Sequence, residues 1–574
     1  MALRSVSIAL AGSGGAGVVT AGAALQEAAA RAGWHALMSR SAGPQIRGGE
    51  AAALLRLAAR PVSSHGDAFD ILVALDWNNI ERFAGEMPLA PGSIVIGDPM
   101  QGEPPDSIAG AGARMLAVPM KDIARAVGGR PNMVALGLLA AMIGLPEAAI
   151  VAVLGRSLAR KGAEVAGAST AALRAGIQAA ADLPRMPLPA PSPAASGMRW
   201  NITGSEAIAM GALRGGVRFV AAYPITPATD VLESLAAALP GLGGTLVQAE
   251  DELASINQII GASWGGVPAL TATSGPGLSL MTESIGLAVA AEVPVVIVDV
   301  MRGGPSTGIP TKSEQSDLDI AIHGLHGDAP HLVVAPVSIG DCLFATQWAV
   351  ALAEALQAPA IVLGDQRLGQ ARAVIERPGD FVFAARRMVY EGGAEAAAYR
   401  RYAITASGVS PMARPGGAGG QYTADGLEHD EAGVPSSRAA DHAAQLDKRA
   451  RKLECHDYGE HWAVIEGEGE LALLAWGSSV PPCREALERL REAGKPARLV
   501  AMRLLSPAQP EKLARALAGV TRVLVVEQSH SGQFHRYLRG SFDLPGEVRS
   551  LHRPGPLPIR PAEVCDAVRG WAMP

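Results

Sequence analysis

Residues 244–281 read GTLVQAEDELASINQIIGASWGGVPALTATSGPGLSLM, and two kinds of pattern alternate along this stretch. The apolar runs GTLVQAE and PALTATS have the length of strands, and a helical pattern begins among the acids of AEDELASINQIIGAS (249–263). Strands that alternate with helices predict an α/β fold with a parallel sheet. This stretch therefore sets the fold class for the sequence around it.

The same alternation continues on both sides. Residues 1–183 contain VSIALAG, ILVALD and SIVIGD, residues 198–375 contain RFVAAYP, PVVIVDV, HLVVAP and PAIVLGD, and residues 468–574 contain ELALLAWGSS, PARLVAMR and RVLVVEQS. The segment PRMPLPAPSPAASG (184–197) is typical of an extended linker. Residues 376–467 are charged and Gly-rich, and we expect an irregular connecting arm there. The sequence thus predicts a multidomain α/β protein with domains at 1–183, 198–375 and a smaller one at 468–574.

The composition argues against several classes of protein, among them nucleic-acid binders and membrane proteins. The 574 residues carry a formal net charge of -6, whereas a duplex nucleic-acid binder normally has a basic balance. There is no uninterrupted apolar run of about 18 residues and no cleavable signal pattern, so we expect a cytoplasmic protein with neither nucleic-acid nor membrane partners. The four cysteines, at positions 342, 455, 483 and 565, form no CxxC pair. We expect no metal site in this chain, so any redox metal must come from elsewhere.

A GxGxxG motif, Gly12, Gly14 and Gly17, follows the first apolar run directly. Glycines let a backbone approach a phosphate, and the N-terminus of the following helix offers unpaired N–H groups to an anion. Nicotinamide binding would need an acid at the end of the second strand, but the segment after the helix, WHALMSRSAGPQIRGGE, has none until Glu50. The motif favours a tight turn with weak anion binding, or a phosphate-bearing substrate such as coenzyme A.

A second glycine-rich segment, SRSAGPQIRGGEA (39–51), places Arg47 beside Gly48 and Gly49. A guanidinium next to unshielded N–H groups suits a carboxylate or a phosphate. A solvated loop with a structural arginine is the alternative.

Polar residues follow several of the strands predicted for residues 198–375. Pro224 and Pro227 stiffen the loop around Thr226, whose hydroxyl is presented at the strand end, where open α/β sheets bind ligands. The alternative role of this threonine is a helix N-cap. Among the adjacent acids of 250–252, one could cap the helix dipole, or a single carboxylate could be held over a ring nitrogen of a cofactor.

The next two strands also end in distinctive segments. The turn at Gly275 and Gly277 is either a plain tight turn or part of a binding site. Arg302, Thr311 and Lys312 are candidates for binding a dianionic acid, against the alternative of a surface loop with incidental charges. The spacing of the histidines at 323, 326 and 331 fits no zinc pattern and favours loop histidines.

Five segments together resemble one family. They are YPITP (223–227), AEDELA (249–254), TSGPG (273–277), RGGPSTGIPTKSEQSDL (302–318) and the RGG segment at 47–49. They are similar to the alpha subunit of 2-oxoacid:ferredoxin oxidoreductases, in the form with the gamma module fused at the N-terminus. Residues 303–318 look most like the 2-oxoglutarate-using members. The resemblance implies a gamma-type domain at 1–183, a thiamine-enzyme pyrimidine-type domain at 198–375 and a transketolase-C-terminal-like domain at 468–574.

The resemblance also implies cofactors and partners. Thiamine diphosphate and Mg²⁺ would be held mainly by a separate beta subunit, which would also carry a [4Fe-4S] cluster, and alpha–beta pairs would form a dimer. With this partner, 2-oxoglutarate would be oxidatively decarboxylated with coenzyme A to succinyl-CoA, CO₂ and reduced ferredoxin. Pyruvate and branched-chain or aryl 2-oxo acids remain alternative substrates. A non-catalytic nucleotide-binding scaffold subunit is the alternative function.

Site roles follow from the same resemblance. Glu252 lies nine residues before Gly261, the spacing expected of the glutamate that hydrogen-bonds N1′ of the aminopyrimidine, with Glu250 as the alternative. Thr226 would lie near the thiazolium and the substrate carbonyl, and Arg302 would pair with the C1 carboxylate. The distal carboxylate would meet Lys312, with Thr311 nearby, or Arg47. The remaining cofactor-binding candidates are Tyr223, Pro224, Ile225, Gly275, Gly277, Gly12, Gly14 and Gly17.

Overall fold

The computed structural model describes residues 5–43, 49–191, 197–392 and 399–571. The chain divides into two compact units, and each is described by itself. The first unit comprises Met1–Thr203, Gln370–Gly379 and Leu557–Asp566. The second comprises Gly204–Gly369, Asp380–Pro556 and Ala567–Pro574.

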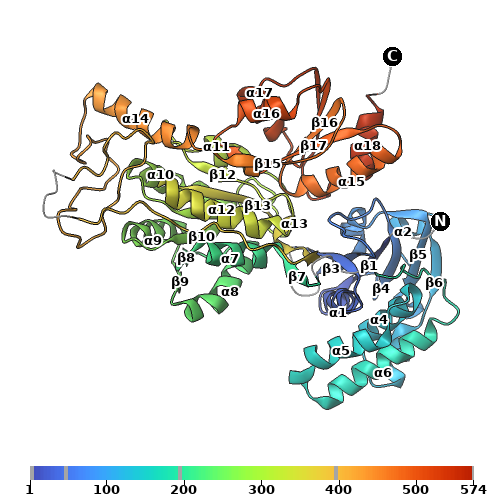
Figure 1. Ribbon diagram of the computed structural model, residues 1–574. Helices are drawn as coiled ribbons and strands as arrows, with labels where there is room; N and C mark the ends of the chain where they lie inside the picture. The colour runs from blue at the N-terminus through green and yellow to red at the C-terminus, as the bar shows by residue number, and fades with distance from the viewer. Residues whose placement is uncertain (1–4, 44–48, 192–196, 393–398, 572–574) are drawn as a thin grey trace. The chain divides into compact units, whose positions relative to one another are not determined.

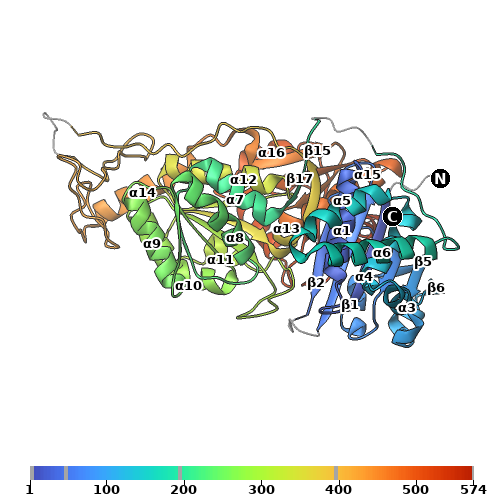
Figure 2. The ribbon, with the colours of Figure 1, turned by 90° about the horizontal axis from the view of Figure 1, so that it is seen from below.

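An eight-stranded mixed sheet forms the centre of the first unit, in the order β6-β5-β4-β1-β3-β2-β14-β7. Its strands β1, β2, β5 and β6 are labelled in Figure 2. Its strands are β1 Ser5–Ser13, β2 His35–Ala42, β3 Glu50–Ala58, β4 Phe69–Ala74, β5 Leu89–Gly97, β6 Arg114–Ala117, β7 Arg199–Thr203 and β14 Arg372–Glu376. The strands β1, β4, β5 and β6 are parallel, as the sequence predicts. The strands β3, β2, β14 and β7 are antiparallel to their neighbours.

The antiparallel half of this sheet departs from the expectation of a parallel one for a physical reason. The strand β2 ends at Ala42 and β3 begins at Glu50, and a connection this short joins antiparallel neighbours, whereas a parallel crossover needs about a dozen residues or more. The strands β7 and β14 lie near the two ends of the stretch 198–375, yet both pair in the sheet of the first unit.

Helices cover one face of this sheet (Figure 2). They are α1 Val18–Arg31, α3 Met120–Ala126, α4 Pro131–Ile143, α5 Glu147–Ser157 and α6 Ala163–Ala179; the short α2 is Asp106–Ala109. The helices α4 and α6 meet closely, since a Cβ at Gly137 would lie 2.1 Å from the carbonyl oxygen of Leu173. No single described helix is long and apolar enough to cross a membrane; α3 and α4 meet that test only as a pair, bent by 108°.

A seven-stranded sheet, in the order β18-β12-β13-β11-β10-β8-β9, forms the centre of the second unit (Figure 1). Its strands are β8 Phe219–Ala222, β9 Thr245–Gln248, β10 Ala269–Thr273, β11 Val296–Met301, β12 Leu332–Val334, β13 Ala360–Asp365 and β18 Leu504–Ser506. All neighbours are parallel except β12 and β18. Each apolar run predicted for residues 198–375 is thus a strand of one sheet.

Helices flank the seven-stranded sheet on both faces, as right-handed crossovers between parallel strands require. They are α7 Gly204–Gly215, α8 Thr229–Ala238, α9 Glu252–Trp264, α10 Gly275–Ala290, α11 Leu318–His323, α12 Asp341–Leu356 and α13 Gln366–Gln370. The helix α7 packs on α8 and α12, and α9 packs on α10. The strand order places α7, α8 and α12 on one face and α9 and α10 on the other. The carboxyl edge of the sheet therefore stays open to the loops.

The C-terminal part of the second unit is a smaller sheet, in the order β15-β17-β16-β19-β20. Its elements are β15 Ala463–Gly467, β16 Leu471–Ala475, β17 Ala497–Met502, β19 Arg522–Glu527, β20 Glu547–His552, α15 Val480–Glu492, α16 Pro510–Ala516 and α17 Gln533–Ser541. The last helix, α18 Pro561–Arg569, begins among the residues of the first unit. The buried Gln315 joins it to the larger sheet: its amide donates to the carbonyl of Trp476 (2.9 Å) and accepts from Ser479 Oγ (2.7 Å).

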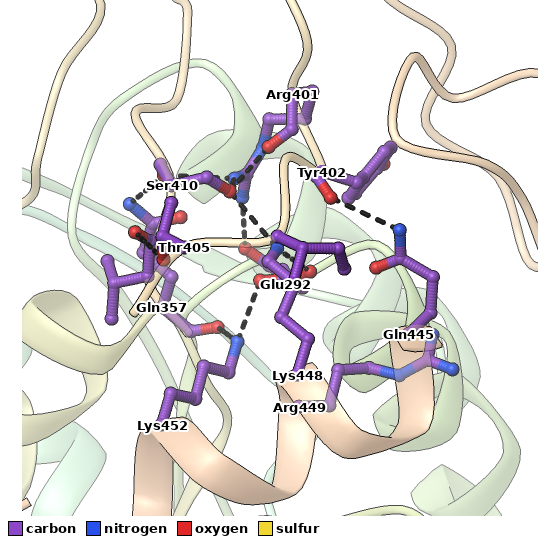
Figure 3. Close-up of polar contacts among 12 residues, drawn as sticks. Glu292, Gln357, Arg401, Tyr402, Thr405, Ser410, Gln445, Lys448, Arg449 and Lys452 are labelled. Atoms are coloured by element: carbon purple, nitrogen blue, oxygen red, sulfur yellow. Dashed lines mark hydrogen bonds and ion pairs between the residues drawn. The ribbon is translucent and has the colours of Figure 1, made fainter. Parts of the chain in front are cut away.

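The stretch expected to be an irregular arm contains a helix, α14 Ala439–Glu454, which a buried ion cluster holds in place (Figure 3). Lys448 Nζ lies 2.5 Å from Glu292 Oε1, and Lys452 Nζ lies 3.0 Å from Glu292 Oε2. Arg401 of the arm donates to the carbonyl oxygen of Glu292 at 2.8 Å. All four side chains are buried, so the cluster ties α14 and the arm to the end of α10.

The charges in this cluster depend on one another. Burial raises the pKa of Glu292, but Lys452, Lys448 and Arg401 outweigh this effect and hold the pKa below its usual range. Burial likewise lowers the pKa of Lys448 to about 8, although Glu292 opposes the shift. A buried ion pair of this kind stabilises only while every partner is present.

Candidate active site

Four neighbouring parallel strands, β11, β10, β8 and β9, end at one edge of the seven-stranded sheet. The segments that follow them contain most of the residues singled out in the sequence. Because the carboxyl ends of parallel strands share an edge, these segments converge. The second unit therefore brings together the Tyr223–Thr226 loop, Glu252, the Gly275–Gly277 turn and Arg302.

The loop after β8 presents its residues to solvent. Tyr223 is 41% exposed, and Pro224 and Thr226 are also exposed. The backbone of the loop is held by Arg302, whose Nη1 donates to the carbonyl oxygen of Thr226 at 2.5 Å. Thr226 does not cap α8, whose N-cap is Ala228. The hydroxyl of Thr226 thus remains accessible at the strand edge.

The three consecutive acids after β9 have different surroundings. Asp251 is the N-cap of α9, and its carboxylate accepts a hydrogen bond from the N–H of Ala254 at 2.7 Å. Glu250 is exposed, whereas Glu252 is 7% exposed. Within the described ranges, the carboxylate of Glu252 has no hydrogen-bond or ion-pair partner. Asp251 therefore caps the helix, whereas Glu252 has a largely buried side chain whose carboxylate accepts no hydrogen bond from the described residues.

Glu252 lies against the first turn of α10. A Cβ at Gly277 would lie 2.0 Å from Oγ1 of Thr273, 2.8 Å from Cγ of Glu252 and 2.9 Å from its Oε1. Only a glycine fits at this contact, so Gly277 is more than a residue of a tight turn. The close approach of α10 holds the Glu252 carboxylate in its buried position.

The segment after β11 forms a closed loop that begins at Arg302. Gly303 donates its N–H to the carbonyl of Lys312 at 3.0 Å, and Ile309 donates to the carbonyl of Gly303 at 2.8 Å. The hydroxyl of Thr311 is buried and has no hydrogen-bond partner among the described residues. Burial lowers the pKa of the Arg302 guanidinium, and Asp317 opposes this effect. The loop thus brings Thr311 and Lys312 back to the strand end that carries Arg302.

Two aspartates at this edge, one buried and one half-buried, were not assigned a role from the sequence. Asp299 lies in β11 and Asp317 precedes α11, and burial raises the pKa of both carboxyl groups. The sequence signal was present, because Asp299 is the single charged residue in the apolar run PVVIVDV (294–300). An acid inside a buried strand needs a partner, which the sequence did not identify.

The glycine motif of the first unit forms a strand-to-helix turn. Gly17 is the N-cap of α1 with φ of 85°, and a Cβ on it would lie 2.3 Å from Nδ2 of Asn132. Several N–H groups of the turn have internal partners: the N–H of Ser13 donates to Asp76 Oδ2 (3.0 Å), and that of Gly14 donates to the carbonyl of Gly49. An anion near Gly12, Gly14 and Gly17 would have to use the remaining N–H groups at the start of α1. Arg47 lies outside the described residues.

The histidine-containing loop carries no cluster of possible metal ligands. His323 and His326 are exposed, while the ring nitrogens of the buried His331 contact the carbonyl oxygens of Ala329 (2.8 Å) and Ala321 (2.7 Å). Across the described ranges, no group of three or more His, Cys, Asp or Glu residues is placed to hold a metal ion.

Three family models match the chain in consecutive stretches. Residues 7–179 match "Pyruvate ferredoxin/flavodoxin oxidoreductase". Residues 210–448 match "Pyruvate flavodoxin/ferredoxin oxidoreductase, thiamine diP-bdg", and residues 460–534 match the C-terminal domain of transketolase. These matches confirm the predicted fold class, with a gamma-like, a thiamine-binding and a transketolase-C-terminal-like part.

Individual relatives extend over most of the chain. Subunit alpha of 2-oxoacid:ferredoxin oxidoreductase 2 from Aeropyrum pernix is 33% identical over 80% of this chain and 76% of its own length. The 2-oxoglutarate synthase subunit KorA from Methanothermobacter marburgensis is 34% identical over 64% of this chain and 98% of its own. The structure of 2-oxoglutarate:ferredoxin oxidoreductase from Magnetococcus marinus with 2-oxoglutarate, coenzyme A and succinyl-CoA bound matches 99% of both chains, with 35% identity and a TM-score of 0.90. Its motifs, its fold and these relatives together place the chain in the 2-oxoacid:ferredoxin oxidoreductase family of enzymes.

Proposed function

We propose that this chain is the alpha subunit of a thiamine diphosphate-dependent oxidoreductase that converts 2-oxoglutarate and coenzyme A to succinyl-CoA and CO₂ and reduces ferredoxin. The observation that carries the proposal is Glu252 at the carboxyl edge of the sheet, whose side chain is 7% exposed, lies against Gly277 and has a carboxylate that accepts no hydrogen bond from the described residues. A carboxylate without a donor is available to accept a hydrogen bond, and a protonated ring nitrogen is a suitable donor.

The residues at this edge fit an aminopyrimidine ring. Glu252 would accept a hydrogen bond from its N1′, and Gly275 and Gly277 let the backbone of α10 approach the ring closely. Tyr223, Pro224 and Ile225 would line its apolar face. When bound, thiamine diphosphate supplies a nucleophilic carbon for the decarboxylation of 2-oxo acids. The part of Glu252 is to orient the ring and to hold a proton at N1′.

The substrate would bind through cationic and hydroxyl groups of the same edge. The Thr226 hydroxyl would hydrogen-bond the 2-oxo group, and Arg302 would pair with the C1 carboxylate. Lys312 and Thr311, across the closed loop, would bind the distal carboxylate, and Arg47 is the alternative cation for it. A second carboxylate in the substrate explains why this edge has cationic side chains at both ends of the 302–312 loop. The relative from Magnetococcus marinus, described with 2-oxoglutarate bound, supports this choice of substrate.

The rest of the reaction requires a partner. We propose that a beta subunit holds the diphosphate with its Mg²⁺ and carries the [4Fe-4S] cluster that passes electrons to ferredoxin. Two alpha–beta pairs would form the complete cytoplasmic enzyme, with coenzyme A as co-substrate. The family model for thiamine binding over residues 210–448 supports the sharing of the cofactor with this chain.

The proposal is tested by purifying the chain anaerobically from its native host with the subunits that co-elute. Coenzyme A-dependent reduction of viologen is then measured with 2-oxoglutarate, pyruvate, a branched-chain and an aryl 2-oxo acid. We expect 2-oxoglutarate to have the highest kcat/KM. A preference for another acid would refute the assigned substrate while keeping the enzyme class. A colourless preparation that is inactive with every acid would favour the scaffold function.

A further inference from the structure

The segment 314–319, which follows the closed loop of the candidate site, contacts the smaller sheet and its helices. The N–H of Gln315 donates to the carbonyl oxygen of Gln528 at 2.8 Å, and the N–H of Gln528 donates to Oε1 of Gln315 at 2.7 Å. Asp319 forms an ion pair with Arg536 of α17. A segment adjacent to the candidate site is therefore joined, at more than one residue, to the C-terminal part of the second unit.

One glutamine of α17 binds two backbone groups of this segment. Nε2 of Gln533 donates to the carbonyl oxygen of Ser316 at 2.9 Å, and its Oε1 accepts a hydrogen bond from the N–H of Asp319 at 3.0 Å. The two bonds lie on either side of Leu318, the first residue of α11. Because both ends of the side-chain amide are used, Gln533 holds the backbone at Ser316 in one position.

The start of α17, from which Gln533 extends, is itself held firmly. The carboxylate of Glu527 is fully buried and accepts hydrogen bonds from the N–H groups of Phe534 and His535, both at 2.8 Å. The N–H of Gln533 donates to Oγ of Ser529 at 3.1 Å. A carboxylate at this place is stabilising, since the N-terminus of a helix carries a partial positive charge. The smaller sheet therefore fixes where the Gln533 side chain begins.

Ser316 connects this contact to the candidate substrate site. Its Oγ donates a hydrogen bond to the carbonyl oxygen of Arg302 at 2.8 Å. Arg302 is 6% exposed, and its Nη1 donates in turn to the carbonyl oxygen of Thr226. A continuous series of hydrogen bonds thus runs from Gln533 through Ser316 and Arg302 to the Thr226 loop, and all four residues belong to the second unit.

We propose that Gln533 is a positioning residue for substrate binding, which acts through Ser316 to hold Arg302 where its guanidinium pairs with the C1 carboxylate of the 2-oxo acid. A guanidinium binds a carboxylate through hydrogen bonds of fixed geometry, so a displaced Arg302 backbone weakens this pairing. The C-terminal part of the unit thereby sets the geometry of a site whose candidate residues all lie elsewhere in the chain. The role in substrate binding rests on the proposed function, whereas the series of hydrogen bonds does not.

Adhesion between the two sheets is the alternative role of Gln533. Other contacts already supply adhesion, because the buried Gln315 donates to the carbonyl oxygen of Trp476 and accepts from Oγ of Ser479. We therefore expect variants at Gln533 to fold and to keep the two sheets joined. The positioning role then has to be measured on the substrate, since adhesion alone would not change the binding of one substrate selectively.

The positioning role is tested by steady-state kinetics of the purified complex. Gln533→Met keeps the length of the side chain and removes both of its hydrogen bonds, and Ser316→Ala removes the bond to Arg302. We expect each change to raise KM for the 2-oxo acid roughly threefold to tenfold, with kcat and the kcat/KM for coenzyme A close to those of the wild type. Ser316→Thr retains a hydroxyl and should keep KM near that of the wild type.

The two changes should not act independently. Because both interrupt one series of hydrogen bonds, the double variant should raise KM no further than the larger single change, whereas independent contacts would give the product of the two effects. Gln509→Ala is the matched control and should leave KM unchanged, because the Gln509 amide donates to the carbonyls of Pro507 and Ala508 beside it. A product of the two effects, or an unchanged KM in Gln533→Met, would overturn the positioning role. So would an equal rise in KM for the 2-oxo acid and coenzyme A.

A second measurement tests the contact without any activity. The N–H of Asp319 donates to Gln533, so hydrogen exchange at this amide should be roughly threefold to tenfold faster in Gln533→Met than in Gln509→Ala. Equal exchange in the two variants would overturn the contact and the proposal with it. A complex inactive with every 2-oxo acid would instead refute the proposed function, and hydrogen exchange would still decide whether Gln533 holds this segment.

Discussion

The contact at Gly277 allows a sharp test of how α10 positions the candidate catalytic carboxylate. In Gly277→Ala, the new Cβ would lie 2.0 Å from Oγ1 of Thr273 and 2.8 Å from Cγ of Glu252. These atoms must separate by roughly 1 Å or more to reach van der Waals contact. Thr273 is fully buried, so the side chain of Glu252 or the first turn of α10 has to move.

Gly277→Ala should affect turnover much more than stability. Overpacking costs about 1–3 kcal/mol of stability, and the better helix propensity of alanine offsets up to about 1 kcal/mol of that. A shift of about 1 Å in a positioned catalytic group can lower turnover by roughly 10²-fold. We therefore expect a large loss of coenzyme A-dependent viologen reduction with a small loss of melting temperature.

A second glycine of the same helix provides the control. A Cβ at Gly286 would meet no atom within 4 Å, so Gly286→Ala should keep full activity and gain up to about 1 kcal/mol of stability. If Gly277→Ala turned over as fast as Gly286→Ala, the close contact would not position Glu252, and this reasoning would be refuted.

Three further substitutions test other parts of the structure. Glu292→Gln leaves the buried lysines of α14 without their counter-ion, so it should lower the free energy of unfolding by about 3–5 kcal/mol in a denaturant titration. Because the fold lowers the pKa of Glu292, the wild type should lose this stability as the pH falls below about 4.5. A variant as stable as the wild type at pH 7 would contradict the stabilising role of the ion cluster. Gly137→Ala should lower the melting temperature, because the new Cβ would meet a backbone carbonyl of α6. Gly167→Ala is the control and should not lower it, because its Cβ would meet no atom within 4 Å. Equal melting temperatures of the two variants would contradict the close packing of α4 on α6. Lys312→Ala should raise KM for 2-oxoglutarate more than for pyruvate, since only the former has a distal carboxylate; an equal effect on both acids would contradict that role.

The strands and the edge where the candidate site lies could be predicted from the sequence. Each apolar run of residues 198–375 is long enough for one buried strand, and parallel strands bring Thr226, Glu252 and Arg302 to one edge whatever the details of the loops. The acids at 250–252 could not be separated by pattern alone. The helix start at Asp251 separates them, because it leaves Glu250 in solvent and buries Glu252.

Other features depend on contacts between residues far apart in the chain. The sequence of α14, AADHAAQLDKRARKLE, has the composition of an exposed helix, yet Lys448 and Lys452 are buried because Glu292, 156 residues before Lys448, meets both. The addition of β7 and β14 to the first sheet likewise depends on pairing across about 170 residues, which local periodicity does not encode. Asp299 is visible as an anomaly in an apolar strand, but that its carboxyl group is fully buried is seen only in the fold.

The central claim is that Glu252, rather than its neighbour Glu250, is the carboxylate that acts on the cofactor. The most direct measurement compares coenzyme A-dependent viologen reduction by complexes carrying Glu252→Gln and Glu250→Gln, after both have been shown to assemble with the partner subunit. We predict that Glu252→Gln loses roughly 10²–10⁴-fold in kcat, the usual contribution of a positioned acid–base group, while Glu250→Gln retains wild-type turnover. Wild-type turnover by an assembled Glu252→Gln complex would contradict the account.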